Sequence, residues 1–200
     1  MKKILALIVC FVFGCFVVSG CANAQKAASV DVSQIKSQHK VLVVYYSRTG
    51  HTKLVAEHLA EKFQADLEPL VDQKNRAGFF SILSAGNDAI GSKATTLSPL
   101  KHNPKDYAVI LIGGPSWYGN TTPAVRTFIT QNDLSGKKIG LFGMCHFTGV
   151  EHAILEASEL IVKDKALAKK IPTLPLREGE LKEDVLAKKI DAFFKAVMQE

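Results

Sequence analysis

Apolar runs with the length of β-strands recur along the chain and alternate with helix-type segments. The first of them is Val41-Leu42-Val43-Val44-Tyr45-Tyr46. The predicted strands cover 41–46, 66–71, 107–113, 139–142 and 171–176. The predicted helices carry apolar residues at helical spacing and cover 50–63, 122–130, 150–162 and 181–198, with a broken helix over 75–93. Continuous apolar strands separated by helices predict an α/β fold, a parallel sheet covered by helices on both faces.

The amino-terminal residues have the composition of an export signal. Lys2-Lys3 precedes an apolar stretch from Ile4 to Val18, and Val18-Ser19-Gly20-Cys21 follows. A basic start, an apolar centre and small residues at the end are typical of a signal peptide, which does not belong to the fold. We therefore predict a signal over 1–20, a tether rich in Ala, Ser, Gln and Lys over 21–39, and one domain over 40–200.

Three fates of this signal are compatible with the sequence. Val18-Ser19-Gly20-Cys21 resembles the lipobox of bacterial lipoproteins, which implies lipidation of Cys21 and a membrane-anchored protein outside the cytoplasm. Ala22-Asn23-Ala24 offers a rival cleavage site, which would release a soluble exported protein. The apolar stretch could also stay uncleaved as an anchor. We take lipidation of Cys21 as the working prediction.

A loop rich in hydroxyl groups joins the first strand to the first helix, with the sequence Ser47-Arg48-Thr49-Gly50-His51-Thr52. Its three hydroxyls can donate hydrogen bonds to phosphate oxygens, and Gly50 allows close approach of the backbone. The following helix adds free N–H groups and a favourable dipole. The loop lacks the Gly-Lys-Ser/Thr of a Walker motif and the G-x-G-x-x-G of dinucleotide folds. An ordinary turn capped by Thr49 or Thr52 is the alternative interpretation.

Two further loops follow apolar strands. Gly113-Gly114-Pro115-Ser116-Trp117-Tyr118-Gly119 comes after the strand that starts at Tyr107. Gly143-Met144-Cys145-His146-Phe147-Thr148-Gly149 comes after the strand over 139–142. With the first loop, these are three candidate binding loops in order, each at the carboxyl end of a strand.

Together, the three loops resemble those of the flavodoxin-like family, and the resemblance runs from Lys40 to the carboxyl terminus. It implies a three-layer fold with a five-stranded parallel sheet of order 2-1-3-4-5, and a non-covalently bound FMN beyond strands one and three. The cofactor-binding residues that it implies are Ser47, Arg48, Thr49, Gly50, His51, Thr52, Pro115, Ser116, Trp117, Tyr118, Gly119, Asn120, Met144, Cys145, His146, Phe147, Thr148 and Gly149.

The resemblance also implies how these residues contact FMN. The first loop holds the phosphate, with His51 contributing its backbone and Arg48 either pairing with the charge or standing in solvent. Trp117, Tyr118 and Phe147 are the candidates for the walls of the flavin ring. The peptide at Tyr118-Gly119-Asn120 stands where the family has one that turns over on reduction, and Gly119 tolerates the positive φ that this needs.

The third loop differs from the Gly- and Ser-rich forms common in the family. Cys145 and His146 are too few for a zinc site, and adjacent side chains on an extended segment point apart, which disfavours a nucleophile pair. We therefore predict no metal site and no catalytic residue, with backbone N–H groups of the loop at the ring edge. His146 as a proton donor stays open.

The cysteine content and the charge exclude a disulfide within the domain and one class of partner. Of four cysteines, Cys10, Cys15 and Cys21 precede the domain, so Cys145 has no partner there for a disulfide. The net charge is +6, but the Lys-rich stretches interleave with acidic residues and no basic groove with aromatics is evident. Nucleic acid is therefore excluded as the expected partner.

Three functions remain. The first is an FMN-dependent electron carrier or oxidoreductase whose partner is a redox protein or the membrane quinone pool. The second is an NAD(P)H:quinone-type FMN reductase, which export disfavours because nicotinamide cofactors are scarce outside the cytoplasm. The third is a lipoprotein that uses the same scaffold for binding without flavin.

Overall fold

The computed structural model describes residues 40–74 and 87–199, so the predicted signal, tether and lipid site at Cys21 lie outside the described residues. The strands are β1 (Val41–Tyr45), β2 (Asp66–Pro69), β3 (Val109–Trp117), β4 (Asn120–Thr121), β5 (Lys138–Cys145) and β6 (Thr173–Arg177). The helices are α2 (His51–Phe63), α4 (Pro123–Gln131), α5 (Val150–Ile161), α6 (Lys165–Ala168) and α7 (Glu183–Gln199), with single 3₁₀ turns at Pro104–Asp106 and Glu178–Glu180.

Five strands form one parallel sheet in the order β2-β1-β3-β5-β6, and β4 pairs antiparallel with the end of β3. The register places Val43 beside Leu67 on one side and Leu111 on the other. Because β4 is not part of the parallel sheet, β5 and β6 are its fourth and fifth strands in chain order. The observed order is therefore the predicted 2-1-3-4-5, the flavodoxin-like arrangement. Sequence analysis therefore predicted both the fold class and the strand order correctly.

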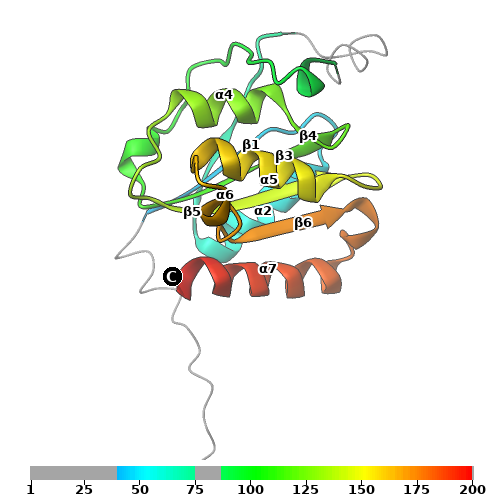
Figure 1. Cartoon of the computed structure of the whole chain (residues 1–200). Helices are drawn as coiled ribbons and strands as arrows, with labels where there is room; N and C mark the ends of the chain where they lie inside the picture. The colour runs from blue at the N-terminus through cyan, green and yellow to red at the C-terminus, as the bar shows by residue number, and fades with distance from the viewer. Residues whose placement is uncertain (1–39, 75–86, 200) are drawn as a thin grey trace, which may run out of the picture. The chain divides into compact units, whose positions relative to one another are not determined.

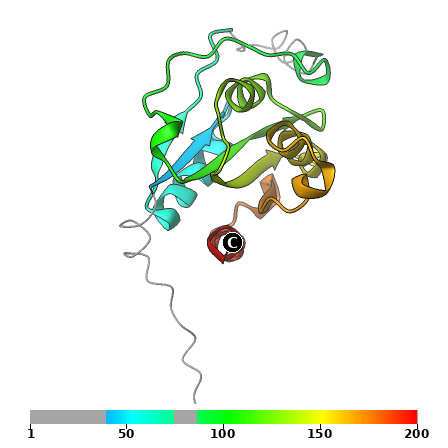
Figure 2. The ribbon, with the colours of Figure 1, turned by 60° about the vertical axis from the view of Figure 1, so that its left-hand side comes forward.

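Helices cover both faces of the sheet, as Figures 1 and 2 show, with α2 and α7 on one face and α4 and α5 on the other. The first face packs Phe63, Phe193 and Phe194 against alternate residues of β1 and β3. The second face packs Phe128 and Ile154 against the strand residues in between. Both faces of each central strand are thus buried. For this reason the sequences of these strands are apolar at nearly every position.

The structure corrects some predicted boundaries. The third strand was predicted to end at Gly113 but continues to Trp117, because the pairing with β5 persists to Pro115 and Met144 and the end of β3 turns back into β4. The fourth strand likewise runs on to Cys145 instead of Phe142. Most of the broken helix predicted over 75–93 lies outside the described residues, which show a helical turn at 87–90.

All five parallel strands end at the same edge of the sheet, on the right in Figure 1, so their carboxyl-terminal loops gather there. No helix within the described ranges is long and apolar enough to cross a membrane.

Candidate functional site

The loop between β1 and α2 presents an open helix N-terminus. Gly50 adopts φ +98° at the N-cap of α2, and no side chain caps the helix. The Ser47 hydroxyl instead accepts a hydrogen bond from the Gly50 N–H at 3.2 Å, which folds the loop back on itself. No acidic residue stands in the first turn. The first N–H groups of α2 therefore remain available for an anion.

The second loop is a tight hairpin. Tyr118 and Gly119 connect β3 to β4 with φ +51° and +78°, as a type I′ turn requires. The Asn120 amide donates to the Tyr118 carbonyl at 2.8 Å. Trp117 lies in the strand just before the turn and packs its ring edge-on against Tyr46, with centroids 5.7 Å apart. The hairpin thus gives Trp117 a fixed orientation beside the end of β1.

Helix α5 anchors this hairpin. Glu156 accepts a hydrogen bond from the Thr121 N–H at 2.7 Å and also pairs with the buried Arg126 of α4. A ring nitrogen of His152 lies 2.8 Å from the Gly119 carbonyl oxygen. Sequence analysis did not identify these three supporting residues, Glu156, His152 and Arg126. Their contacts join segments that are far apart in the sequence, and local sequence patterns do not show such contacts.

The third loop contacts the second directly. The Ser116 hydroxyl donates to the Gly149 carbonyl at 3.0 Å. Gly149 adopts φ +89°, and a Cβ built there would lie 2.8 Å from the Gly119 Cα. Glycine at both positions therefore lets the two backbones touch. Gly149 is also the N-cap of α5, again with no side-chain cap.

A carboxylate that sequence analysis missed bridges the first and third loops. Glu178, in the 3₁₀ turn after β6, contacts Nδ1 of His146 through one carboxylate oxygen, and its other carboxylate oxygen lies 3.6 Å from Nε2 of His51. His51, predicted to contribute only its backbone, thus also directs its side chain to Glu178. Because Glu178 follows the carboxyl end of a parallel strand, its position in the sequence was a usable signal.

Arg177, next to Glu178, holds the third loop from the other side. Its guanidinium donates to the Phe147 carbonyl at 3.2 Å and to Glu151 of α5 at 2.6 Å. Hydrogen bonds from backbone N–H and from Arg177 hold the pKa of the Glu151 carboxyl below its usual range. The loop at 146–149 is therefore supported by charged side chains on an otherwise apolar strand end.

The three loops enclose one cavity of about 360 Å³, within the size range of small-ligand pockets. Its lining residues come from every predicted loop and from the 3₁₀ turn after β6: Arg48, Thr49, His51, Pro115, Ser116, Trp117, Met144, Cys145, His146 and Glu178. The lining thus includes Arg48 and the hydroxyl-bearing Thr49 of the first loop together with the aromatic Trp117. The cavity is thus suited to a ligand with an anionic group and an aromatic part.

The other predicted residues lie outside the lining of this cavity. Tyr118 and Phe147 are 65% and 75% exposed, so their rings stand in solvent at the hairpin and third loop. Thr52 is buried on α2, while Ser47 and Gly50 face a neighbouring cavity. Gly119, Asn120, Thr148 and Gly149 shape the two loops without lining the cavity.

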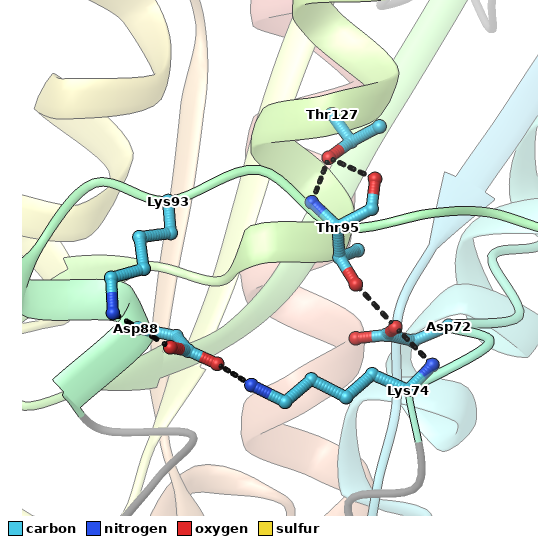
Figure 3. Close-up of polar contacts among 6 residues, drawn as sticks. All are labelled: Asp72, Lys74, Asp88, Lys93, Thr95 and Thr127. Atoms are coloured by element: carbon cyan, nitrogen blue, oxygen red, sulfur yellow. Dashed lines mark hydrogen bonds and ion pairs between the residues drawn. The ribbon is translucent and has the colours of Figure 1, made fainter.

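The neighbouring cavity, of about 580 Å³, lies between the ends of β1 and β2 and shares Arg48 with the first. Two of its lining residues, Asp72 and Lys74, belong to the polar network that Figure 3 shows. Asp72 accepts from the Thr95 hydroxyl at 2.6 Å, and the Thr95 N–H donates to the buried Thr127 of α4 at 2.9 Å. Lys74 pairs with the buried Asp88 at 2.5 Å. Through Thr95 and Thr127, this wall of the neighbouring cavity is joined to α4.

Within the described ranges, no group of three or more His, Cys, Asp or Glu side chains is arranged to hold a metal ion. Glu178 contacts His146 and lies 3.6 Å from His51 without forming such a group.

Cys145 is buried at the end of β5, and this burial raises the pKa of its thiol, against the opposing effect of the Val150 N–H. The thiolate fraction near pH 8 is then below that of an ordinary cysteine, and the thiolate is the reactive form. We expect iodoacetamide at pH 8 to leave Cys145 largely unmodified in the native chain and to alkylate it rapidly in urea. Peptide mass spectrometry measures both, and rapid native alkylation would contradict the burial of this thiol.

No protein-family model matches the chain. Among solved structures, it is similar to a candidate flavoprotein from Bacteroides eggerthii, with 22% identity over 78% of this chain and 98% of that one and a TM-score of 0.57. A candidate flavoprotein from Bacteroides uniformis gives 20% identity, 76% and 97% coverage, and a TM-score of 0.57. A flavoprotein from Lactobacillus acidophilus, solved in complex with FMN, gives 20% identity, 70% and 91% coverage, and a TM-score of 0.52. At this level of identity, these likenesses show the fold.

Proposed function

We propose that the chain binds FMN non-covalently in the cavity of about 360 Å³ between the three loops, and that it serves as an electron-transfer flavoprotein. The observation that carries this proposal is the uncapped N-terminus of α2, with Arg48 and Thr49 beside it, on the cavity that Trp117 also lines. This donor set suits a phosphate, and the indole suits a flat ring. The FMN-bound relative from Lactobacillus acidophilus supports the proposal through its fold.

Each part of the site has a separate task. The hydroxyl of Thr49, the guanidinium of Arg48 and the first N–H groups of α2 hold the phosphate. The indole of Trp117 covers one side of the ring and excludes water from it. The flavin supplies the capacity to accept and release electrons when bound. Glu178 keeps His146 at the cavity wall, where its ring can hold a proton close to the ligand.

The proposed location is the outer side of a membrane, with Cys21 lipidated and 21–39 as a tether. It is motivated by Lys2-Lys3, the apolar stretch over 4–18 and Val18-Ser19-Gly20-Cys21. At such a location electrons come from a redox protein or a quinone in preference to NAD(P)H. Cys21→Ser should abolish lipid labelling; wild-type chain found in the cytoplasm with Met1 intact would contradict this location.

The experiment for FMN is reconstitution. The full chain is purified in mild detergent, unfolded, refolded with excess FMN and passed through a gel-filtration column. We expect the protein peak to carry stoichiometric flavin, seen as absorption of blue light. A folded but colourless protein peak would contradict FMN binding and leave the scaffold as a flavin-free binding protein.

A further inference from the structure

The starting edge of the sheet carries an unusual concentration of lysine. We define the amino-end face as Lys40 together with 64–66, 103–108, 132–138 and 162–172, the segments from which the parallel strands begin. It holds eight lysines against four aspartates. All other described residues together hold twelve Lys and Arg against thirteen Asp and Glu. The net positive charge of the described domain therefore resides on this face.

Hydrogen bonds join these segments into one surface. The Lys40 carbonyl accepts from the Ala108 N–H at 3.1 Å, and the Ala108 carbonyl accepts from the Lys138 N–H at 2.9 Å. The Lys137 ammonium donates to the Tyr107 carbonyl at 2.7 Å, and Lys137 and Lys163 line the same cavity. In Figure 1 the starts of the strands lie on the left, opposite the loops of the candidate site.

The lysines of this face are available to an external partner. Lys105, Lys163, Lys169 and Lys170 are exposed and form no ion pair with another residue of the part of the chain that the structure describes. Asp133 interacts electrostatically with Lys105 and Lys137, and it accepts a hydrogen bond from the Ser135 N–H. The four aspartates of the face offset only half of its eight lysines, so a net positive charge remains there.

We propose that the amino-end face docks on the anionic headgroups of the membrane to which the chain is tethered, so that the flavin cavity faces away from the bilayer. The inference rests on the proposed tethering. Charge complementarity supports it, because each lysine near an anionic lipid surface adds attraction. The place where the chain enters the domain supports it too, because the proposed anchor precedes Lys40, itself on this face.

This orientation identifies the kind of electron-transfer partner. β5 has eight residues and separates the face from the cavity by about 26 Å. A quinone dissolved in the bilayer cannot reach a cavity that opens at the opposite end of the domain. The partner is then a protein that approaches from the aqueous side.

Lysine acetylation of the full chain in vesicles tests the orientation. Phosphatidylglycerol vesicles are compared with phosphatidylcholine vesicles, and the rate at each lysine is read by mass spectrometry. We expect Lys105, Lys163 and Lys170 to react about fivefold more slowly in the anionic vesicles, an effect that 0.5 M salt removes. Lys182 and Lys188, elsewhere on the exposed surface, should react equally in both.

Two matched double variants sharpen the test. Lys163→Gln with Lys170→Gln should return Lys105 to its rate in neutral vesicles, whereas Lys182→Gln with Lys188→Gln should not. Equal rates at Lys105 in the two lipids, or equal slowing at Lys182 and Lys188, would overturn the proposal. Flotation with the vesicles measures whether the chain is anchored, and absorption of visible light measures whether it carries FMN. A failure of anchoring or of FMN binding is therefore distinguished from a failure of the proposed orientation.

Discussion

Gly149→Ala is expected to lower the free energy of unfolding by about 3 kcal/mol, because it imposes two costs at once. The residue adopts φ +89°, and a non-glycine residue in the left-handed region loses about 1–2 kcal/mol. The new Cβ would also meet the Gly119 backbone at 2.8 Å, and overpacking of this kind costs about 1–3 kcal/mol. Denaturant unfolding followed by circular dichroism measures the loss.

Gly136→Ala is the matched control for this prediction. Gly136 adopts φ +70°, but a Cβ there would have nothing within 4 Å. Only the conformational cost applies, so we expect a loss of about 1–2 kcal/mol. If the two variants lose the same stability, the close contact between the second and third loops is not present in solution.

Thr49→Val is expected to weaken FMN binding by about 10- to 150-fold while leaving the affinity for riboflavin unchanged. Valine keeps the shape of threonine but cannot donate to the phosphate, and a hydrogen bond to a charged group contributes about 1.5–3 kcal/mol. Riboflavin lacks the phosphate and does not use this donor. Quenching of flavin fluorescence during titration gives both dissociation constants.

Thr173→Val provides the control for Thr49→Val. Thr173 is also an exposed threonine but begins β6, at the opposite end of the sheet. We expect both of its flavin affinities to match those of the unmodified chain. A loss of riboflavin affinity in Thr49→Val would indicate damage to the whole loop, and unchanged FMN affinity would remove Thr49 from the phosphate site.

Local patterns predicted the parts of the fold that depend on local interactions. The run from Val41 to Tyr46 predicts a strand buried on both faces, because its side chains are apolar at every position and not only at alternate ones. The hydroxyl loop before α2 could be predicted as an anion site because such a site at a helix N-terminus needs few residues, all close in sequence. Arg48, Thr49 and Trp117 line one cavity, and its use by an anion stays a prediction.

Other features depend on contacts between distant segments. Trp117 was predicted to lie in a loop, but pairing with Asn120 of β4 keeps its backbone in a strand, and its ring packs against Tyr46. Glu178 lies far in sequence from both His51 and His146, so no local motif could connect them. Tyr118 and Phe147, the other predicted candidates for the ring walls, are exposed because each stands at the tip of a turn.

The central claim is that the cavity recognises a flavin through its phosphate, and a comparison of FMN with riboflavin tests it most directly. The refolded full chain is titrated with each flavin under the same conditions, and the dissociation constants are obtained from fluorescence quenching. With at least two charge-assisted contacts to the phosphate, FMN should bind at least 100-fold more tightly than riboflavin. Equal affinities for the two flavins, or no binding of either, would contradict the claim.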